Sequence, residues 1–203
     1  MPTALISVYH KEGIDTFAKE LIRLGWTIIS SGGTARFLHQ SDIPVTDIAQ
    51  ITGLSPVLDH RVVTLVPHIH GGLLATDEMQ AELEQLGYPQ IDLCCVDFYP
   101  LEAAISDRRA TTASVIEKTD IGGPTMIRSA AKGRRIVIVD PADRMKVIPW
   151  LDLGKPDEDN FRRLLAAKAE ALVAQYCLRS AIFHSGGLVS GSIDIRIKIP
   201  DLQ

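Results

Sequence analysis

The segment ALISVYHKEGIDTFAKELIRLGWTIISSGGTARFLHQ, residues 4–40, contains two strand–helix units in succession. Residues 4–8 form a short apolar run that predicts a buried strand, and residues 14–24 place apolar side chains at helical spacing. Residues 26–31 repeat the strand pattern, and a Gly-Gly turn leads into a second helix over residues 34–40. Strand–helix repetition of this kind predicts a parallel sheet covered by helices, with right-handed crossovers.

The rest of the chain continues the pattern. Three further apolar runs predict strands at residues 43–48, 91–100 and 134–140, and the second of these should lie inside the sheet because it is apolar almost throughout. Helices are predicted at residues 78–87, 123–133 and 157–183. Residues 49–74 show no regular period, so we expect a long functional loop there. The fold class is therefore α/β, a parallel sheet with helices on both faces, ending in a long helix and a tail.

Composition narrows the class of protein. With 46% hydrophobic and 23% charged residues, the 203-residue chain is typical of a soluble globular domain, and no apolar run is long enough to cross a membrane. A net charge of −4 argues against non-specific nucleic-acid binding, although a small anion needs only a few local donors. Adjacent Cys94 and Cys95 in an apolar run indicate buried thiols, so we expect a cytoplasmic protein that binds neither nucleic acid nor membranes.

Two glycine-bearing turns are candidates for an anion site. In SSGGTA, Ser31 and Thr34 offer hydroxyl donors beside a helix start, and Lys11 follows the neighbouring strand. The same sequence is also consistent with a Gly-Gly turn that only starts a helix and binds no anion. In TDIGGPTMIRSAAK, Asp120 precedes a second helix start and Lys132 ends that helix. The helix amides could stabilise a negative oxygen with Asp120 as base, or Asp120 could be an acidic cap and Lys132 a surface lysine.

Three histidines of the long segment are candidate metal ligands. His60, His68 and His70 lie close in sequence, but no cysteine accompanies them and Asp59 is a single carboxylate. We therefore favour ordinary loop histidines and no metal.

Five motifs together resemble the inosine monophosphate cyclohydrolase domain, which normally precedes a formyltransferase domain in the bifunctional purine-biosynthesis enzyme. The resemblance runs from Ala4 to Ser185, and the formyltransferase half is absent from this sequence. Its motifs are ALISVYHKEGI, SSGGTARFL, LDHRVVTLVPHIHGG, IDLCCVDFYPLE and DIGGPTMIRSAAK.

The resemblance implies a methylglyoxal synthase-like fold and the last step of purine synthesis. In that step the carboxamide nitrogen of a formylated aminoimidazole carboxamide ribonucleotide attacks the formyl carbon and water leaves, with no cofactor and no metal. It also implies a purine ribonucleotide as the small-molecule partner, a homodimer, and a separate formyltransferase to supply the substrate.

The resemblance also implies roles for individual residues. The residues expected to bind the substrate are Ser7, Lys11, Ser31, Gly33, Thr34, Arg61, Thr64 and Ile121. Tyr99 would stand beside the base, and Asp120 with the amides of Gly122 and Gly123 beside the reacting groups. Lys132 would be the cation near the reaction centre.

Several positions depart from the family pattern. Tyr9 and His10 replace a serine and an aspartate, and Asp97 replaces an asparagine. Val63 stands where a catalytic lysine is expected, and Val66 and His68 replace His and Lys. We hypothesise that His68 or His60 supplies the missing proton donor.

Three functions remain open at this point. The first is a working cyclohydrolase. The second is a related enzyme acting on a modified ribonucleotide in specialised nucleoside synthesis, and the third is a non-catalytic nucleotide-binding module. We expect one domain over residues 1–187, with residues 188–203 as an edge strand or an interface arm.

Overall fold

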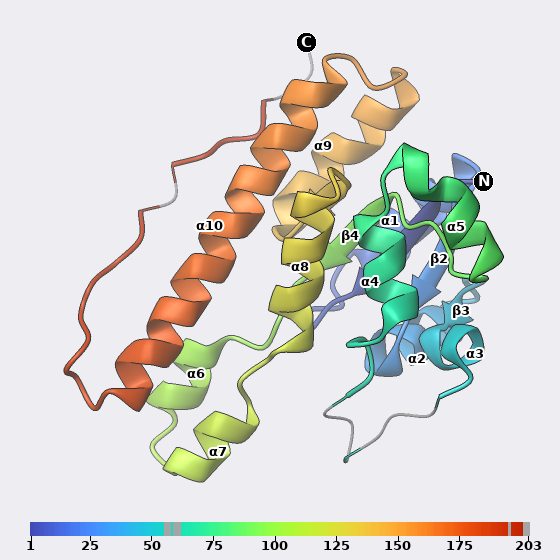
Figure 1. The fold of residues 1–203 in the computed structure, drawn as a ribbon. Coiled ribbons are helices and arrows are strands. Elements are labelled where there is room, and N and C mark those ends of the chain that lie inside the picture. Colours follow the sequence, from blue (N-terminus) through green and yellow to red (C-terminus); the bar gives the residue numbers. More distant parts are fainter. Residues whose placement is uncertain (55–57, 59–61, 195, 201–203) are drawn as a thin grey trace.

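A computed structural model of the chain describes residues 1–54, 58, 62–194 and 196–200. Over this part of the chain, five parallel strands form one sheet in the order β3-β2-β1-β4-β5 (Figure 1). All five coincide with the apolar runs in the sequence. Their bounds are β1 Thr3–Ser7, β2 Thr27–Ser30, β3 Thr46–Asp47, β4 Leu93–Val96 and β5 Ile136–Ile138. The α/β fold with helices on both faces is therefore confirmed.

Alternate residues of the strands build two separate cores. Ala4 and Ile6 of β1 pack on one face with residues of α1 (Ile14–Arg23) and α9 (Pro141–Asp152). Leu5, between them, packs on the other face with residues of three further helices. These are α4 (Pro67–Leu74), α8 (Gly122–Lys132) and α10 (Glu158–His184). Because both faces are covered, the central strands are mostly apolar, and β4 is buried at all four positions. The edge strand β3, formed by Thr46 and Asp47, is the polar exception.

Residues 49–74 are more regular than the sequence suggested. Two helices lie in this segment, α3 (Ile48–Thr52) and α4. A capping box between Asp47 and Gln50 starts α3, and Pro67 occupies the first turn of α4. The expectation of an irregular loop is wrong for residues 48–52 and 67–74, because both helices are too short to show an amphipathic period. Residues 55–57 and 59–61 of the same segment lie outside the described residues.

The remaining helices connect the strands at the edges of the sheet. They are α2 (Gly32–Gln40), η1 (Asp77–Met79), α5 (Gln80–Gln85), α6 (Leu101–Ser106) and α7 (Thr112–Glu117). Figure 1 shows α6 and α7 together at one end of α10, below α8. None of the described helices combines the length and apolar content needed to cross a membrane.

The tail after α10 follows that helix back toward α9 (Figure 1). Gly191 approaches Leu178 of α10, and Ile199 is buried in the core beside α9. The Lys146 ammonium donates a hydrogen bond to the Ile199 carbonyl at 2.6 Å. The described tail residues contain no strand.

Candidate functional site

The strand order places a crevice between β1 and β4. From β1 the chain builds β2 and β3 on one side, and β4 and β5 then form on the other side. In open parallel sheets, ligands bind at the carboxyl ends of the two strands where this reversal occurs. Here β1 ends at Ser7 and β4 ends at Val96, which Asp97 follows directly. Two adjoining cavities of about 280 and 520 Å³ lie there, which we call the switch-point cleft; both are lined by Ser7, Ser31, Val63, Asp97, Glu117, Thr119 and Asp120.

The switch-point cleft brings together most of the residues singled out in the sequence. Ser31 and Gly122, from the two glycine-bearing turns, line the same 280 Å³ cavity. Other predicted residues that line one cavity or both are Ser7, Lys11, Gly33, Thr34, Thr64, Tyr99, Asp120, Ile121 and Gly123. Arg61 lies outside the described residues. The two turns therefore open onto one crevice.

The start of α2 lines one side of the cleft. Ser31 is the N-cap residue, and its side chain makes no hydrogen bond to the helix that it caps. Gly32 has a φ of 53°, in the left-handed region where glycine is favoured. The hydroxyl of Ser31 and the amides of the first turn are thus placed to meet an anion.

Thr34 has a different task from the one expected. Its hydroxyl accepts a hydrogen bond from the Val8 N–H at 3.1 Å and donates one to the Val8 carbonyl at 3.0 Å. Thr34 is buried, so these bonds tie α2 to the end of β1. The prediction of a free hydroxyl donor at Thr34 is corrected, since the exit of β1 needs partners for its last backbone groups.

Asp120 lies beside the first turn of α8. Its Oδ1 accepts the Gly123 N–H at 3.0 Å, and its own N–H donates to the Tyr176 hydroxyl at 2.7 Å. Burial raises the pKa of the Asp120 carboxyl, although the amides of Gly123 and Gly122 oppose this rise. A carboxylate with a raised pKa in a cleft is a stronger base than an exposed one.

The glycines beside Asp120 leave space for other groups. A Cβ at Gly123 would lie 2.7 Å from Asp120 Oδ2, and a Cβ at Gly122 would lie 2.7 Å from Thr64 Oγ1. The Gly123 N–H, expected to face a negative oxygen of the substrate, is already bonded to Asp120. This expectation is therefore corrected: the first turn of α8 orients the candidate base.

The comparisons with known proteins fit this architecture. Residues 13–125 match the MGS-like domain family. The chain belongs to that family. Among solved structures, this MGS-like chain is similar to the one titled "Crystal structure of ForH", with 32% sequence identity and a TM-score of 0.80. The match covers 94% of this chain and 100% of the ForH chain.

Lys132 is not part of the switch-point cleft of this MGS-like chain. It lies in the last turn of α8, whereas Asp120 precedes the first turn. Both residues line a separate groove of about 610 Å³ between α8 and α10, with Lys132 at the far end of the helix. The structure thus does not bring Lys132 to the reaction centre expected from the sequence, because about 15 Å of helix axis separates the two ends of an 11-residue helix.

The hypothesis that His68 or His60 supplies the missing proton donor is not supported for His68. His68 does not line the cleft, and its ring packs against Tyr88 with centroids 4.4 Å apart. His70 contacts Ser129 of α8 at 2.9 Å through Nδ1, and His60 lies outside the described residues. His68 is therefore not placed to replace the family lysine. Val63, which stands at the lysine position, does line both cavities.

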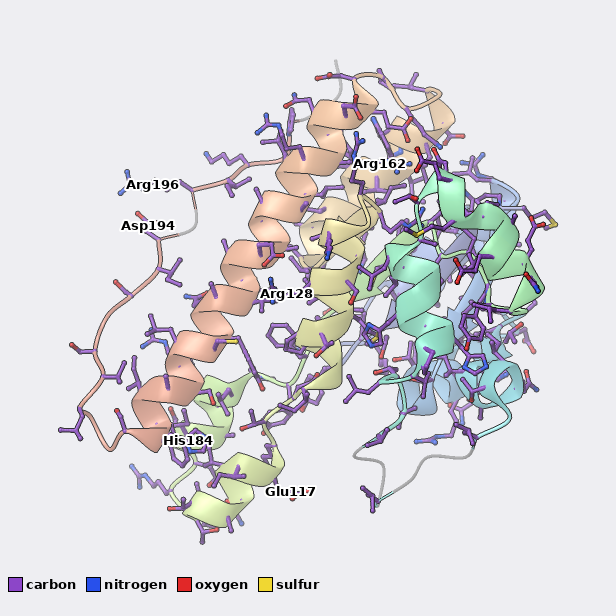
Figure 2. All side chains as sticks on the ribbon, in the orientation of Figure 1. Glu117, Arg128, Arg162, His184, Asp194 and Arg196 are labelled. Atoms are coloured by element: carbon purple, nitrogen blue, oxygen red, sulfur yellow. The ribbon has the colours of Figure 1, made fainter. Side chains whose placement is uncertain are left out.

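Some residues of the cleft escaped the sequence reasoning. Lys118 lies with its ammonium 5.3 Å from the ring centroid of Tyr99, and that ring packs edge-on against Tyr9. Glu117 and Arg36 also line the cleft. Figure 2 shows Glu117 near α7, at the opposite end of the molecule from Arg162 of α10. A charged run such as Glu117-Lys118 looks like an ordinary solvated turn in sequence, so no local signal would have revealed these contacts.

Proposed function

We propose that this protein binds a purine-type ribonucleotide 5′-phosphate in the switch-point cleft and closes a ring on its base, as inosine monophosphate cyclohydrolase does. The observation that carries the proposal is the shared cavity of Ser31 and Gly122. A phosphate donor set and a half-buried carboxylate thereby face one ligand from opposite ends.

The phosphate end consists of the α2 start and the β1 exit loop. Ser31 supplies a hydroxyl, the first turn of α2 supplies amides and the positive end of its dipole, and Lys11 lines the same 520 Å³ cavity. A 5′-phosphate held there would lead its ribose toward β4 and the base toward Asp120.

The reacting end consists of Asp120 and its neighbours. In the proposed reaction, the carboxamide nitrogen forms a bond to the formyl carbon while Asp120 accepts a proton from that nitrogen. The formyl oxygen becomes a hydroxyl and then leaves as water, taking up the nitrogen proton and a second proton from the formamide N–H. Because both reacting groups belong to one molecule, the protein contributes mainly orientation. Lys118, which lines the same cavity as Asp120, is the candidate carrier of the second proton: its ammonium donates to the leaving oxygen and regains a proton from the formamide N–H.

A related ribonucleotide is the second candidate substrate. Val63 removes a cation from the cleft, and Asp97 adds a carboxylate where the family has an asparagine. The missing cation at Val63 favours a ligand that develops less negative charge in this part of the cleft. Such a substrate would belong to specialised nucleoside synthesis.

A direct assay distinguishes these possibilities. Purified protein is mixed with the formylated aminoimidazole carboxamide ribonucleotide, and formation of the purine product is followed by ultraviolet absorbance. Turnover well above the spontaneous rate, lost in Asp120→Asn, supports ring closure. Tight binding without turnover supports a non-catalytic module. If the protein shows no binding and no turnover, this substrate is contradicted and the second candidate is favoured.

A further inference from the structure

The loop that leaves β1, residues 8–12, is held from several sides. Ile14 N–H donates to the Lys11 carbonyl at 3.2 Å, and Thr34 holds both backbone groups of Val8. The Lys11 ammonium donates to the Val8 carbonyl and, at 3.3 Å, to the Tyr9 carbonyl. The position of the Lys11 ammonium therefore depends on the backbone conformation of residues 8–12.

Asp97 fixes the middle of that loop from β4. Its Oδ1 accepts hydrogen bonds from the N–H groups of Tyr9 and of His10, the latter at 3.2 Å. Its Oδ2 is buried, accepts no hydrogen bond from the described residues, and lies 3.5 Å from His10 Nδ1. A buried carboxylate in this position needs a counter-charge.

Arg144 of α9 supplies the counter-charge and holds the end of the loop. Its side chain is only 6% exposed, its Nη2 lies 3.7 Å from Asp97 Oδ2, and its Nη1 donates to the Glu12 carbonyl at 3.1 Å. The guanidinium thus bridges Asp97 and the last residue of the loop. A planar guanidinium can make both contacts at once, which a lysine ammonium cannot do with the same geometry.

The start of α9 is itself anchored. Asp140 accepts the Ala142 N–H at 2.9 Å, and the Lys168 ammonium of α10 lies 2.7 Å from carboxylate oxygens of both Asp140 and Asp143. Arg144 follows these residues directly. The support for the loop therefore runs from α10 through the first turns of α9.

We propose that Asp97 and Arg144 are positioning residues that hold Lys11 in place for the phosphate of the ligand; this inference rests on the proposed function. Neither residue needs to touch the phosphate. Asp97 fixes the loop amides, Arg144 joins Asp97 to the Glu12 carbonyl, and Lys11 lies between these two attachments. A preorganised cation binds an anion more tightly than one that must be ordered on binding.

The charge of Asp97 has a second consequence for Lys11. Burial lowers the pKa of the Lys11 ammonium, and Asp97 opposes that lowering. Other charged or titratable groups around the same cavity are Arg36 of α2, His10 of the loop, Tyr99 after β4, and Glu117, Lys118 and Asp120 before α8. Removing the Asp97 charge lowers the Lys11 pKa further, so Lys11 loses its charge at a lower pH and anion affinity falls earlier as pH rises.

The test measures the affinity of inosine monophosphate and of inorganic phosphate by calorimetry over a range of pH. Asp97→Asn keeps an oxygen for the loop amides but removes the charge. We expect about tenfold weaker binding of both probes, as for other residues that orient a binding group without touching the ligand. Affinity falls at high pH as Lys11 loses its charge, and this part of the profile, the basic limb, should move to lower pH.

A second variant separates positioning from folding. Asp97→Asn alone leaves the Arg144 charge buried without its partner, whereas Asp97→Asn with Arg144→Met removes both charges. The double variant should regain thermal stability relative to Asp97→Asn and still bind phosphate weakly with the shifted limb. Arg23→Met is the matched control, because it removes an exposed ion pair between α1 and Asp152 at the far end of the same α9.

The outcomes are distinct for the two proposals. Wild-type affinity and an unshifted limb in both Asp97 variants would overturn the positioning role while leaving the ribonucleotide proposal intact. Binding of phosphate but not inosine monophosphate by the wild type, with the expected losses in the variants, would support the positioning role and contradict the purine ligand. Binding of neither probe would overturn both.

Discussion

The Asp120 carboxylate and the backbone of Gly123 lie in direct contact: Oδ1 accepts the Gly123 N–H at 3.0 Å, and a Cβ at Gly123 would meet Oδ2 at 2.7 Å. Gly123 thus determines where the candidate base can lie. A residue with any side chain at this position must move Asp120 or the helix start.

Gly123→Ala should therefore impair catalysis without removing a functional group. Phe98 lies 3.3 Å from the same Cβ position, so the added methyl group is crowded on a second side and cannot simply turn away from the carboxylate. A displacement of about 1 Å can reduce the rate roughly a hundredfold. Steady-state kinetics measures kcat/KM, and thermal unfolding checks that the variant folds. Unchanged kcat/KM in a folded variant would show that the placement of Asp120 is not critical.

Asp120→Asn should separate activity from stability. The amide oxygen still accepts the Gly123 N–H, but the base is lost, and turnover should fall by about 10²–10⁴-fold. In the wild type, burial raises the pKa of Asp120 in the folded state, so ionisation at neutral pH opposes folding. At pH values above the folded-state pKa of Asp120, the unfolding free energy of the variant should equal or exceed that of the wild type. This gain should disappear as the pH falls below the pKa of Asp120 in the unfolded chain.

The same pKa predicts the acid side of the activity profile. The base acts only when ionised, so kcat/KM should fall with decreasing pH at a higher value than an exposed aspartate would give. Rates measured across the acid range for the wild type check this. A plateau that extends down to the ordinary aspartate range would argue against Asp120 as the base.

Thr34 and Ser31 should respond in opposite ways to loss of their hydroxyls. Thr34→Val leaves the buried Val8 N–H without a partner and removes one of the two hydrogen bonds that the Val8 carbonyl accepts, the other coming from Lys11. The variant should cost about 1–3 kcal/mol of unfolding free energy. Ser31→Ala should change stability little, because the Ser31 hydroxyl makes no hydrogen bond to the helix, yet weaken phosphate binding by about 10–100-fold. Urea unfolding and calorimetry measure the two quantities. Equal effects of both variants on stability alone would remove Ser31 from the anion site.

Much of the fold could be predicted from sequence because its strands are continuous apolar runs. The sequence pattern predicted the positions of all five described strands and of the helices α1, α8 and α10. The structure adds α9, which contains Pro149 and lacks an amphipathic pattern, so neither propensity nor periodicity indicates a helix. It also adds α4, where two glycines weaken the helical signal.

At the site, the sequence predicted which turns meet but not how their atoms pair. Ser31, Gly122 and Asp120 share a crevice because strand order brings their turns to one edge. The partners of Thr34 and of the Gly123 N–H depend on distances that no motif encodes. The contact between Asp97 and Arg144 joins residues 47 positions apart with no local signature.

Val63→Lys tests the choice of substrate. Val63 lines both cavities where the cyclohydrolase pattern has a lysine. If the protein performs the same ring closure, restoring the cation should raise turnover of the formylated ribonucleotide by about tenfold or more, since a single donor to a developing oxyanion contributes at least that much. Lower turnover in a folded variant, with binding retained, would favour the related ribonucleotide instead.

A crystal structure of the protein soaked with inosine monophosphate tests the central claim most directly. The account predicts one nucleotide in the switch-point cleft, its phosphate at Ser31 and the first turn of α2, and its base beside Asp120 and Gly122. A nucleotide bound only in the groove between α8 and α10, or a phosphate placed away from Ser31, would contradict it.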